Sequence, residues 1–347
     1  MHIHDLDTPT LIADLDVLEK NIQDMASLCQ NLDIPLRVHT KTHKVPEISK
    51  LQLAAGSQGI TCQKLGEAES MVDAGIDNIL IPYNIVGTPK VKRLTALSKR
   101  ATIIVAVDSE TTANGISLQA TQDGCVIPLI IELDTGSGRC GVQSPIHALQ
   151  LAQKIDKLSG VDLQGIMTYP SNVRVKQYIS ETVDLFKIDG LSVNIISGGG
   201  TGSEAASKEI GCTETRSGSY VYEGLSRIGN SDMLSPEECV LRVLTTVVST
   251  PTPERIIIDG GQKTFASYPP SPYGHIIEFP DAKIYGMSVE HGHVDVSNCT
   301  NKFQVGDKLS VIPLHQGMTS NLHDELVGIR GDKVETVWQI AGRGKVK

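Results

Sequence analysis

The sequence lacks any pair of cysteines in C-x-x-C spacing, and its seven cysteines are odd in number. This absence argues against a zinc ribbon and a disulfide framework, and it predicts a reducing, cytoplasmic location. No apolar run reaches the length of a membrane span, and Met1-His2-Ile3-His4 does not begin a signal peptide, so we expect neither a membrane protein nor a secreted one. The net charge of −9 argues against a nucleic-acid partner, which would require a basic face.

The remaining composition is that of an ordinary globular protein. The chain has 347 residues, of which 40% are hydrophobic and 20% are charged, and this length suits one large or two ordinary domains. No internal repeat or low-complexity linker separates its parts, so we expect two closely packed domains.

Short apolar runs alternate with amphipathic helical patterns over residues 16–238. Apolar residues recur at helical spacing along 16–29, and the same alternation continues to the glycine-rich turn near 198. Such alternation predicts a parallel sheet, either doubly wound or closed into a barrel. The predicted strands are 34–39, 58–62, 78–82, 102–107, 127–134, 163–168 and 193–197, and the predicted helices include 16–29, 45–55, 65–74, 145–158 and 178–187.

Beyond about residue 240 the pattern changes to short β-branched runs separated by turn signals such as Asp259-Gly260-Gly261. No stretch of helical periodicity intervenes, which predicts an antiparallel β domain formed by residues 1–15 plus 239–347.

Two lysines and two histidines gather in Arg37-Val38-His39-Thr40-Lys41-Thr42-His43-Lys44, at the end of a predicted strand. A lysine amine becomes a nucleophile when burial or neighbouring cations lower its pKa. A run of charges can equally be a solvated loop, so this cluster alone leaves both interpretations open.

A second feature, Ser197-Gly198-Gly199-Gly200-Thr201-Gly202-Ser203, follows another predicted strand. A glycine-rich turn lets backbone N–H groups approach a phosphate, although it can also be a flexible turn. Together, a strand-end lysine and a phosphate cradle favour a phosphorylated carbonyl cofactor bound as a Schiff base, and pyridoxal 5'-phosphate fits that description.

The ordered motifs resemble the alanine racemase-like (fold type III) pyridoxal phosphate enzymes, in particular the D-threonine aldolase and D-serine dehydratase branch. This resemblance implies a (β/α)8 barrel of the TIM type followed by an antiparallel β domain. The matching segments are Thr8–Asp16, Arg37–Lys44, Cys62–Lys64, Glu67–Glu69, Asp134–Gly136, Arg139–Val142, Gly198–Gly202, Gly218–Val221, Asp259–Lys263, Glu290–Gly292, Pro313–His315, Asn321–Asp324 and Val337–Trp338.

The resemblance also implies roles for individual residues. Lys41 matches the Schiff-base lysine, with Lys44 as a competitor that we expect to be solvated or to begin a helix. The catalytic residues implied are Lys41, His39 and Tyr169, and the cofactor-binding residues implied are Lys41, Gln63, Arg139, Tyr169, Gly199, Gly200, Thr201 and Tyr220.

Two departures from the family pattern affect the chemistry. The branch usually binds a divalent metal (Mn, Mg or Zn) through histidine-x-cysteine or histidine-x-aspartate, whereas this chain has His315-Gln316-Gly317. His315 is therefore the one matching ligand, and because Gly317 has no side-chain donor we expect weak or absent metal binding. The family often has a histidine shortly after the tyrosine that matches Tyr169, and Pro170-Ser171-Asn172 follows here.

The resemblance implies a lyase acting on a small D-3-hydroxy amino acid, similar to D-threonine aldolase. Alternatives are a D-serine dehydratase-like lyase, an amino-acid racemase, and a non-catalytic pyridoxal phosphate carrier. A metal-dependent barrel hydrolase would leave the glycine-rich turn unexplained. The family further implies a small amino-acid substrate and a homodimer with shared active sites.

Overall fold

The computed structural model describes residues 1–225, 235–266 and 273–347. Contacts within the chain divide it into two compact units, which we call the β unit and the barrel unit. The division falls inside helix α1 (Leu15–Asn31). The β unit comprises Met1–Ile22, Thr42–Glu47 and Ser219–Gly344, and the barrel unit comprises Gln23–Lys41, Ile48–Gly218 and Lys345–Lys347.

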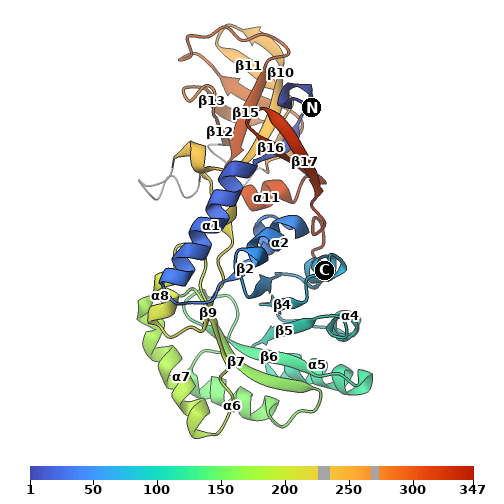
Figure 1. The fold of residues 1–347 in the computed structure, drawn as a ribbon, viewed down its shortest axis with the longest axis vertical. Helices are drawn as coiled ribbons and strands as arrows, with labels where there is room; N and C mark the ends of the chain where they lie inside the picture. Colours follow the sequence, from blue (N-terminus) through green and yellow to red (C-terminus); the bar gives the residue numbers. More distant parts are fainter. Residues whose placement is uncertain (226–234, 267–272) are drawn as a thin grey trace. The chain divides into compact units, whose positions relative to one another are not determined.

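The barrel unit contains a sheet of eight parallel strands that follow one another in chain order. Its ends meet where Leu36 bridges Thr215 in parallel, and the Thr215 N–H donates to the Pro35 carbonyl at 2.9 Å. The predicted (β/α)8 barrel is therefore confirmed (Figure 1). The strands are β2 (Arg37–His39), β3 (Gly59–Thr61), β4 (Asn78–Ile81), β5 (Thr102–Val107), β6 (Ile127–Asp134), β7 (Val161–Tyr169), β8 (Ile195–Gly198) and β9 (Glu214–Thr215).

The strands of the barrel are apolar on both faces because one face packs inside the barrel and the other packs against helices. In β5, every residue from Ile103 to Val107 is buried. Alternate side chains of neighbouring strands form one cluster, made by Leu80, Ile104, Ala106, Ile130 and Met167.

Helices connect successive strands of the barrel and lie beside them in Figure 1. Ser109 and Ser144 cap two of them by accepting a backbone N–H at the third residue beyond. The helices after α1 are α2 (Pro46–Ala54), α3 (Leu65–Asp73), α4 (Thr88–Ser98), α5 (Glu110–Asp123), α6 (Pro145–Ile155), α7 (Lys176–Ile188) and α8 (Glu204–Glu209). Short 3-10 helices are η1 (Ile3–Asp5), η2 (Thr40–Thr42), η3 (Val173–Val175), η4 (Ser219–Val221) and η5 (Pro236–Glu238).

Each predicted strand and helix overlaps an observed one. In the barrel unit, the helices α4, α5 and α8 and the strand β9 were not predicted. In α5, Thr111, Thr112, Asn114 and Gly115 break the apolar stripe that sequence patterns depend on. The two residues of β9 are too few to show any periodicity.

The β unit is built on a second sheet whose strands are mainly antiparallel. The N-terminal strand β1 is the exception, since it pairs antiparallel with β10 and parallel with β16. Two short helices, α10 (Gln262–Phe265) and α11 (Gln316–Ser320), interrupt the strands. The strands are β1 (Thr10–Asp14), β10 (Leu241–Thr252), β11 (Arg255–Ile258), β12 (Gly274–Ile276), β13 (Lys283–Met287), β14 (Gly292–Asp295), β15 (Lys308–Pro313), β16 (Glu325–Arg330) and β17 (Lys333–Gln339).

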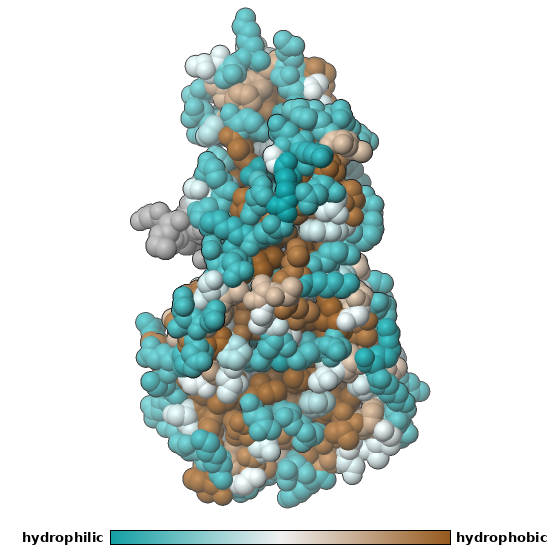
Figure 2. Space-filling model, viewed as in Figure 1, coloured by the Kyte–Doolittle hydropathy of each residue, from teal (hydrophilic) through white to brown (hydrophobic). Residues whose placement is uncertain are grey.

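Hydrophilic residues cover much of the visible surface of each unit, and apolar residues are exposed among these hydrophilic ones (Figure 2). None of the helices in the described ranges is long and apolar enough to cross a membrane.

Candidate active site

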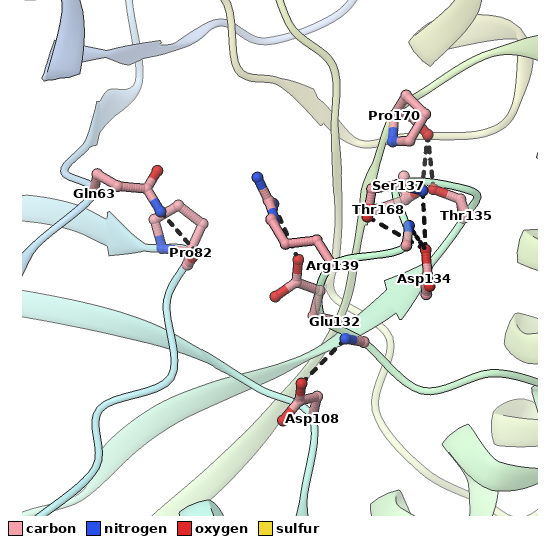
Figure 3. Close-up of polar contacts among 12 residues, drawn as sticks. Gln63, Pro82, Asp108, Glu132, Asp134, Thr135, Ser137, Arg139, Thr168 and Pro170 are labelled. Atoms are coloured by element: carbon pink, nitrogen blue, oxygen red, sulfur yellow. Dashed lines mark hydrogen bonds and ion pairs between the residues drawn. The ribbon is translucent and has the colours of Figure 1, made fainter.

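Polar side chains gather where the strands of the barrel unit end. His39 is the last residue of β2, Gln63 follows β3, Arg139 lies in the loop after β6, and Tyr169 ends β7. Because all strands of a parallel barrel point the same way, these residues share its C-terminal face, where barrel enzymes carry out their chemistry. Figure 3 shows Gln63, Arg139 and Glu132 in this region.

Lys41 lies in η2, directly after β2, and part of its side chain reaches solvent. The surroundings of its amine are nevertheless mostly protein, and this desolvation lowers the pKa of Lys41. The positive charges of Arg139 and Arg216 lower that pKa further, whereas the Glu67 carboxylate opposes them. A larger fraction of neutral amine at neutral pH makes Lys41 a nucleophile for a carbonyl carbon.

His39 is buried beside Lys41 and its pKa lies well below the usual value, first because of burial and then because of the charges on Lys41 and Arg216. Its Nε2 lies 3.2 Å from Gln63 Oε1. Its Nδ1 lies 3.5 Å from the Lys41 backbone nitrogen, which donates to it. These contacts assign a neutral ring with the proton on Nε2, because Gln63 Oε1 can only accept and the Lys41 N–H can only donate.

Arg139 is held on two sides. Its Nη2 lies 3.4 Å from Oε1 of the buried Glu132, and its guanidinium carbon lies 5.2 Å from the centre of the Tyr169 ring. Burial raises the pKa of Glu132, although the Arg139 charge opposes that shift. The Asp134 carboxylate accepts the backbone N–H groups of 136, 137 and 138 and so folds the loop that carries Arg139 (Figure 3).

The glycine turn after β8 is compact because two of its glycines have no room for a side chain. A Cβ on Gly198 would overlap Cys212 Sγ, and one on Gly199, whose φ is +93°, would overlap Thr215 Oγ1. A Cβ on Gly200 would instead make an ordinary contact with Tyr169 at 3.6 Å. Packing within the protein therefore requires glycine at positions 198 and 199 but not at 200.

The turn also fits a phosphate group. In the described part of the chain, the buried Thr215 Oγ1 has no hydrogen-bond partner, and no hydrogen bond from the Gly200 N–H is found. A buried donor without a partner is costly, and an anion would satisfy it. Neighbouring donors are already used, since the Gly202 N–H donates to Glu204 and the Gly199 N–H donates to Ser171 Oγ at 2.7 Å.

Arg216 belongs to this site although the sequence analysis did not select it. It follows β9, is buried, and donates from Nη2 to the Thr168 carbonyl at 2.8 Å and from Nη1 to Ser197 Oγ at 2.7 Å. The sequence shows no strand pattern at this position, because β9 has only two residues, so Arg216 could not be recognised as an arginine at a barrel strand end.

Two predicted site residues lie in the β unit. Tyr220 is buried in η4, and His315 is an exposed residue that precedes α11. The His315 Nδ1 accepts the Met318 N–H at 3.2 Å and so caps that helix. The roles predicted for both residues remain predictions.

The donors around His315 do not fit a divalent metal. Gly317 offers no side-chain ligand, and His323 and Asp324 contact the Thr264 carbonyl and Arg343, respectively. Across the described ranges, no three His, Cys, Asp or Glu side chains are placed to hold a metal ion.

Comparison with known proteins points to one family. Residues 13–226 match the family described as alanine racemase, N-terminal domain, and residues 240–329 match the putative serine dehydratase domain. The D-threonine aldolase of Arthrobacter sp. is 36% identical over 98% of this chain and 93% of its own length. The 3-hydroxy-D-aspartate aldolase of Paracoccus denitrificans (strain Pd 1222) is 33% identical over 98% and 93%. The crystal structure of D-threonine aldolase from Filomicrobium marinum superposes with a TM-score of 0.92 at 30% identity, covering 99% of this chain and 97% of that one.

Proposed function

Because this chain belongs to the alanine racemase-like (fold type III) pyridoxal phosphate enzymes, in the branch of D-threonine aldolase and D-serine dehydratase, we propose that it is a lyase that cleaves a small D-3-hydroxy amino acid. The names of the relatives, D-threonine aldolase and 3-hydroxy-D-aspartate aldolase, support this class of substrate.

The observation that carries the proposal is the Lys41 amine at the barrel mouth, whose pKa is lowered by desolvation and by the guanidinium groups of Arg139 and Arg216. Lys41 would bind the cofactor aldehyde, and the glycine turn would bind its phosphate through the Gly200 N–H and the Thr215 hydroxyl. When bound, pyridoxal phosphate would supply an electron sink for the negative charge that develops at the substrate Cα.

The side chains around Lys41 would orient the bound molecules and exclude water from the site. His39 is neutral and buried, so it adds no charge and keeps water from the inner side of the site. Gln63 Oε1 holds the His39 ring by accepting a hydrogen bond from the His39 Nε2. The Arg139 side chain is 53% exposed and its guanidinium carbon lies 5.2 Å from the centre of the Tyr169 ring, and it would bind an anionic oxygen such as that of the cofactor's ring hydroxyl.

Two proton transfers would complete the cleavage. A base takes the proton of the 3-hydroxyl as the bond between Cα and Cβ breaks, which releases an aldehyde, and Cα then gains a proton to give an amino acid shortened by that aldehyde. Tyr169 carries a hydroxyl group at the mouth and is 42% exposed, and we propose that its deprotonated oxygen takes the proton of the 3-hydroxyl. The proton that Cα gains would come from the protonated Lys41 Nζ. No step uses His315, because its surroundings do not fit a metal.

Turnover of D- and L-3-hydroxy amino acids by the purified protein, with and without manganese, tests the proposal. Release of an aldehyde from a D-substrate supports it, and a Lys41→Ala variant is the control. A keto acid and ammonia would identify a dehydratase, and conversion into the other enantiomer would identify a racemase. A visible cofactor band without turnover of any amino acid would identify a non-catalytic carrier. The family resemblance further supports a homodimer with shared active sites, which sedimentation of the purified protein would test.

A further inference from the structure

A chain of hydrogen bonds runs through the inside of the barrel from Arg216 to Arg37. The Arg216 Nη1 donates to Ser197 Oγ at 2.7 Å, and that hydroxyl donates in turn to Glu214 Oε1 at 2.5 Å. On the far side, Arg37 Nε donates to Glu214 Oε2 at 2.8 Å. The strands β8 and β9 place Ser197 opposite Glu214 by their parallel pairing.

All four side chains are buried, with exposed fractions of 4% for Arg37 and Arg216, 2% for Glu214 and 0% for Ser197. A buried charge is tolerated only when opposite charge and hydrogen bonds compensate it. Glu214 therefore serves two guanidinium groups at once, Arg37 directly and Arg216 through the Ser197 hydroxyl. None of the proton transfers assigned above uses Glu214 or Ser197.

The direction of these hydrogen bonds explains how Glu214 fixes the position of Arg216. Ser197 has one proton, and it donates that proton to the carboxylate, so its lone pairs face the Arg216 N–H. This arrangement fixes Arg216 on one side, while the Thr168 carbonyl fixes it on the other at 2.8 Å. The charge of the guanidinium held in this way lowers the pKa of both Lys41 and His39.

We propose that Glu214 is a positioning residue that acts through the Ser197 hydroxyl to hold the Arg216 guanidinium against the cofactor lysine, Lys41. The inference rests on the proposed function, since it takes Lys41 to be that lysine. Glu214 acts through geometry, because it fixes Arg216 through Ser197. The carboxylate whose charge opposes the arginines at Lys41 is that of Glu67.

The two variants of the hydrogen-bond chain differ in how far they release Arg216. Glu214→Gln keeps an oxygen that can accept the Ser197 proton, so Arg216 stays held and the titration midpoint of the Lys41 nitrogen stays close to that of wild type. Ser197→Ala keeps the charge but frees Arg216 on one side, so the average distance from Arg216 to Lys41 grows and the midpoint rises. Other groups that face Lys41 are Arg139, Glu67 and His39, and neither variant changes them.

The test is a spectrophotometric pH titration of the holoenzyme, which follows the band of the Schiff base between the cofactor and Lys41. We expect the Glu214→Gln midpoint to lie close to that of wild type and the Ser197→Ala midpoint to lie higher by roughly one pH unit or less, as for a charge acting at short range. The matched control is Glu69→Gln, which removes the same charge from an ion pair with Arg93 between helices α3 and α4, and it should titrate like wild type.

A Ser197→Ala midpoint equal to that of wild type would overturn the proposal, and so would an equal shift in Glu69→Gln. If Glu214→Gln does not fold because it leaves two buried arginines without a carboxylate, Ser197→Ala decides alone. A wild-type protein without a cofactor band would refute the proposed function instead. The hydrogen-bond chain would then be tested by the pH dependence of Lys41 acetylation, with the same pattern of midpoints expected.

Discussion

The Lys44 Nζ donates a hydrogen bond to Asn321 Oδ1 at 2.8 Å, and the same oxygen accepts the Gly344 N–H at 3.1 Å. Lys44 is buried in the β unit, so the expectation that it would be solvated or would begin a helix is wrong. Through Asn321, the Lys44 amine links its loop to the end of α11 and to Gly344. Lys41, three residues earlier, belongs to the barrel unit, and the two lysines of the motif therefore have separate tasks.

This separation predicts which lysine carries the cofactor. Borohydride reduction followed by peptide mapping should place the label on Lys41, and Lys41→Ala should lose the visible band while it keeps its fold. Lys44→Ala should retain the band but unfold more easily, by about 1–3 kcal/mol, because the half-buried Asn321 loses a charged donor. A label found on Lys44 would show that the assignment is wrong.

The buried His39 predicts a loss of stability in acid. Its pKa in the folded protein lies well below the ordinary value of 6.5, first because of burial. Below 6.5 the unfolded chain therefore binds a proton that the folded protein does not, so the free energy of unfolding falls as the pH decreases through this range. Melting temperatures of wild type and His39→Gln should diverge least near pH 5 and most near pH 7, with the exposed His147→Gln as the control. Parallel curves would contradict the assignment of a neutral His39.

Neighbouring glycines of the turn should respond differently to substitution. Gly199→Ala combines a φ of +93° with overlap of Thr215 Oγ1, so we expect it to destabilise the protein by about 2 kcal/mol or more. Gly200→Ala adds a methyl group in ordinary contact with Tyr169, so it should change stability by about 0.5 kcal/mol or less.

Cofactor affinity then separates a structural turn from a phosphate site. If the Gly200 N–H binds the phosphate, Gly200→Val should weaken cofactor affinity more than it lowers the melting temperature of the cofactor-free protein. Unchanged affinity would exclude Gly200 from the phosphate site. Equilibrium dialysis of pyridoxal phosphate with wild type and with Gly200→Val measures the two affinities.

The surroundings of His315 predict weak binding of divalent metal. Chelator should leave wild-type activity unchanged, and isothermal titration should detect at most weak manganese binding. Gly317→Asp adds a carboxylate two residues from His315 and should tighten manganese binding by creating a second ligand. Stoichiometric metal that resists dialysis against chelator would mean that other residues form the site.

Sequence patterns were sufficient for a parallel sheet, and the family resemblance added the (β/α)8 barrel. The strand-end positions of Lys41, Arg139 and Tyr169 follow from alternation alone, because parallel strands bring their ends together. Arg216 and Glu214 escaped notice because β9 has two residues and shows no pattern. The Ser197–Glu214 contact was also out of reach, since it depends on the register between strands 17 residues apart.

The strand β9, which closes the barrel, allows opening of the site to be followed at one backbone amide, that of Thr215. The barrel closes at the Thr215 N–H, which donates to the Pro35 carbonyl at 2.9 Å, and Arg216 is the next residue. Because the Arg216 N–H is bonded to the Gly198 carbonyl at 2.8 Å, Arg216 stays with β8 when this seam opens and separates from β2, the strand that leads to Lys41. Hydrogen exchange at the Thr215 amide therefore reports how often the barrel opens along its seam and, with the same frequency, how often the site comes apart.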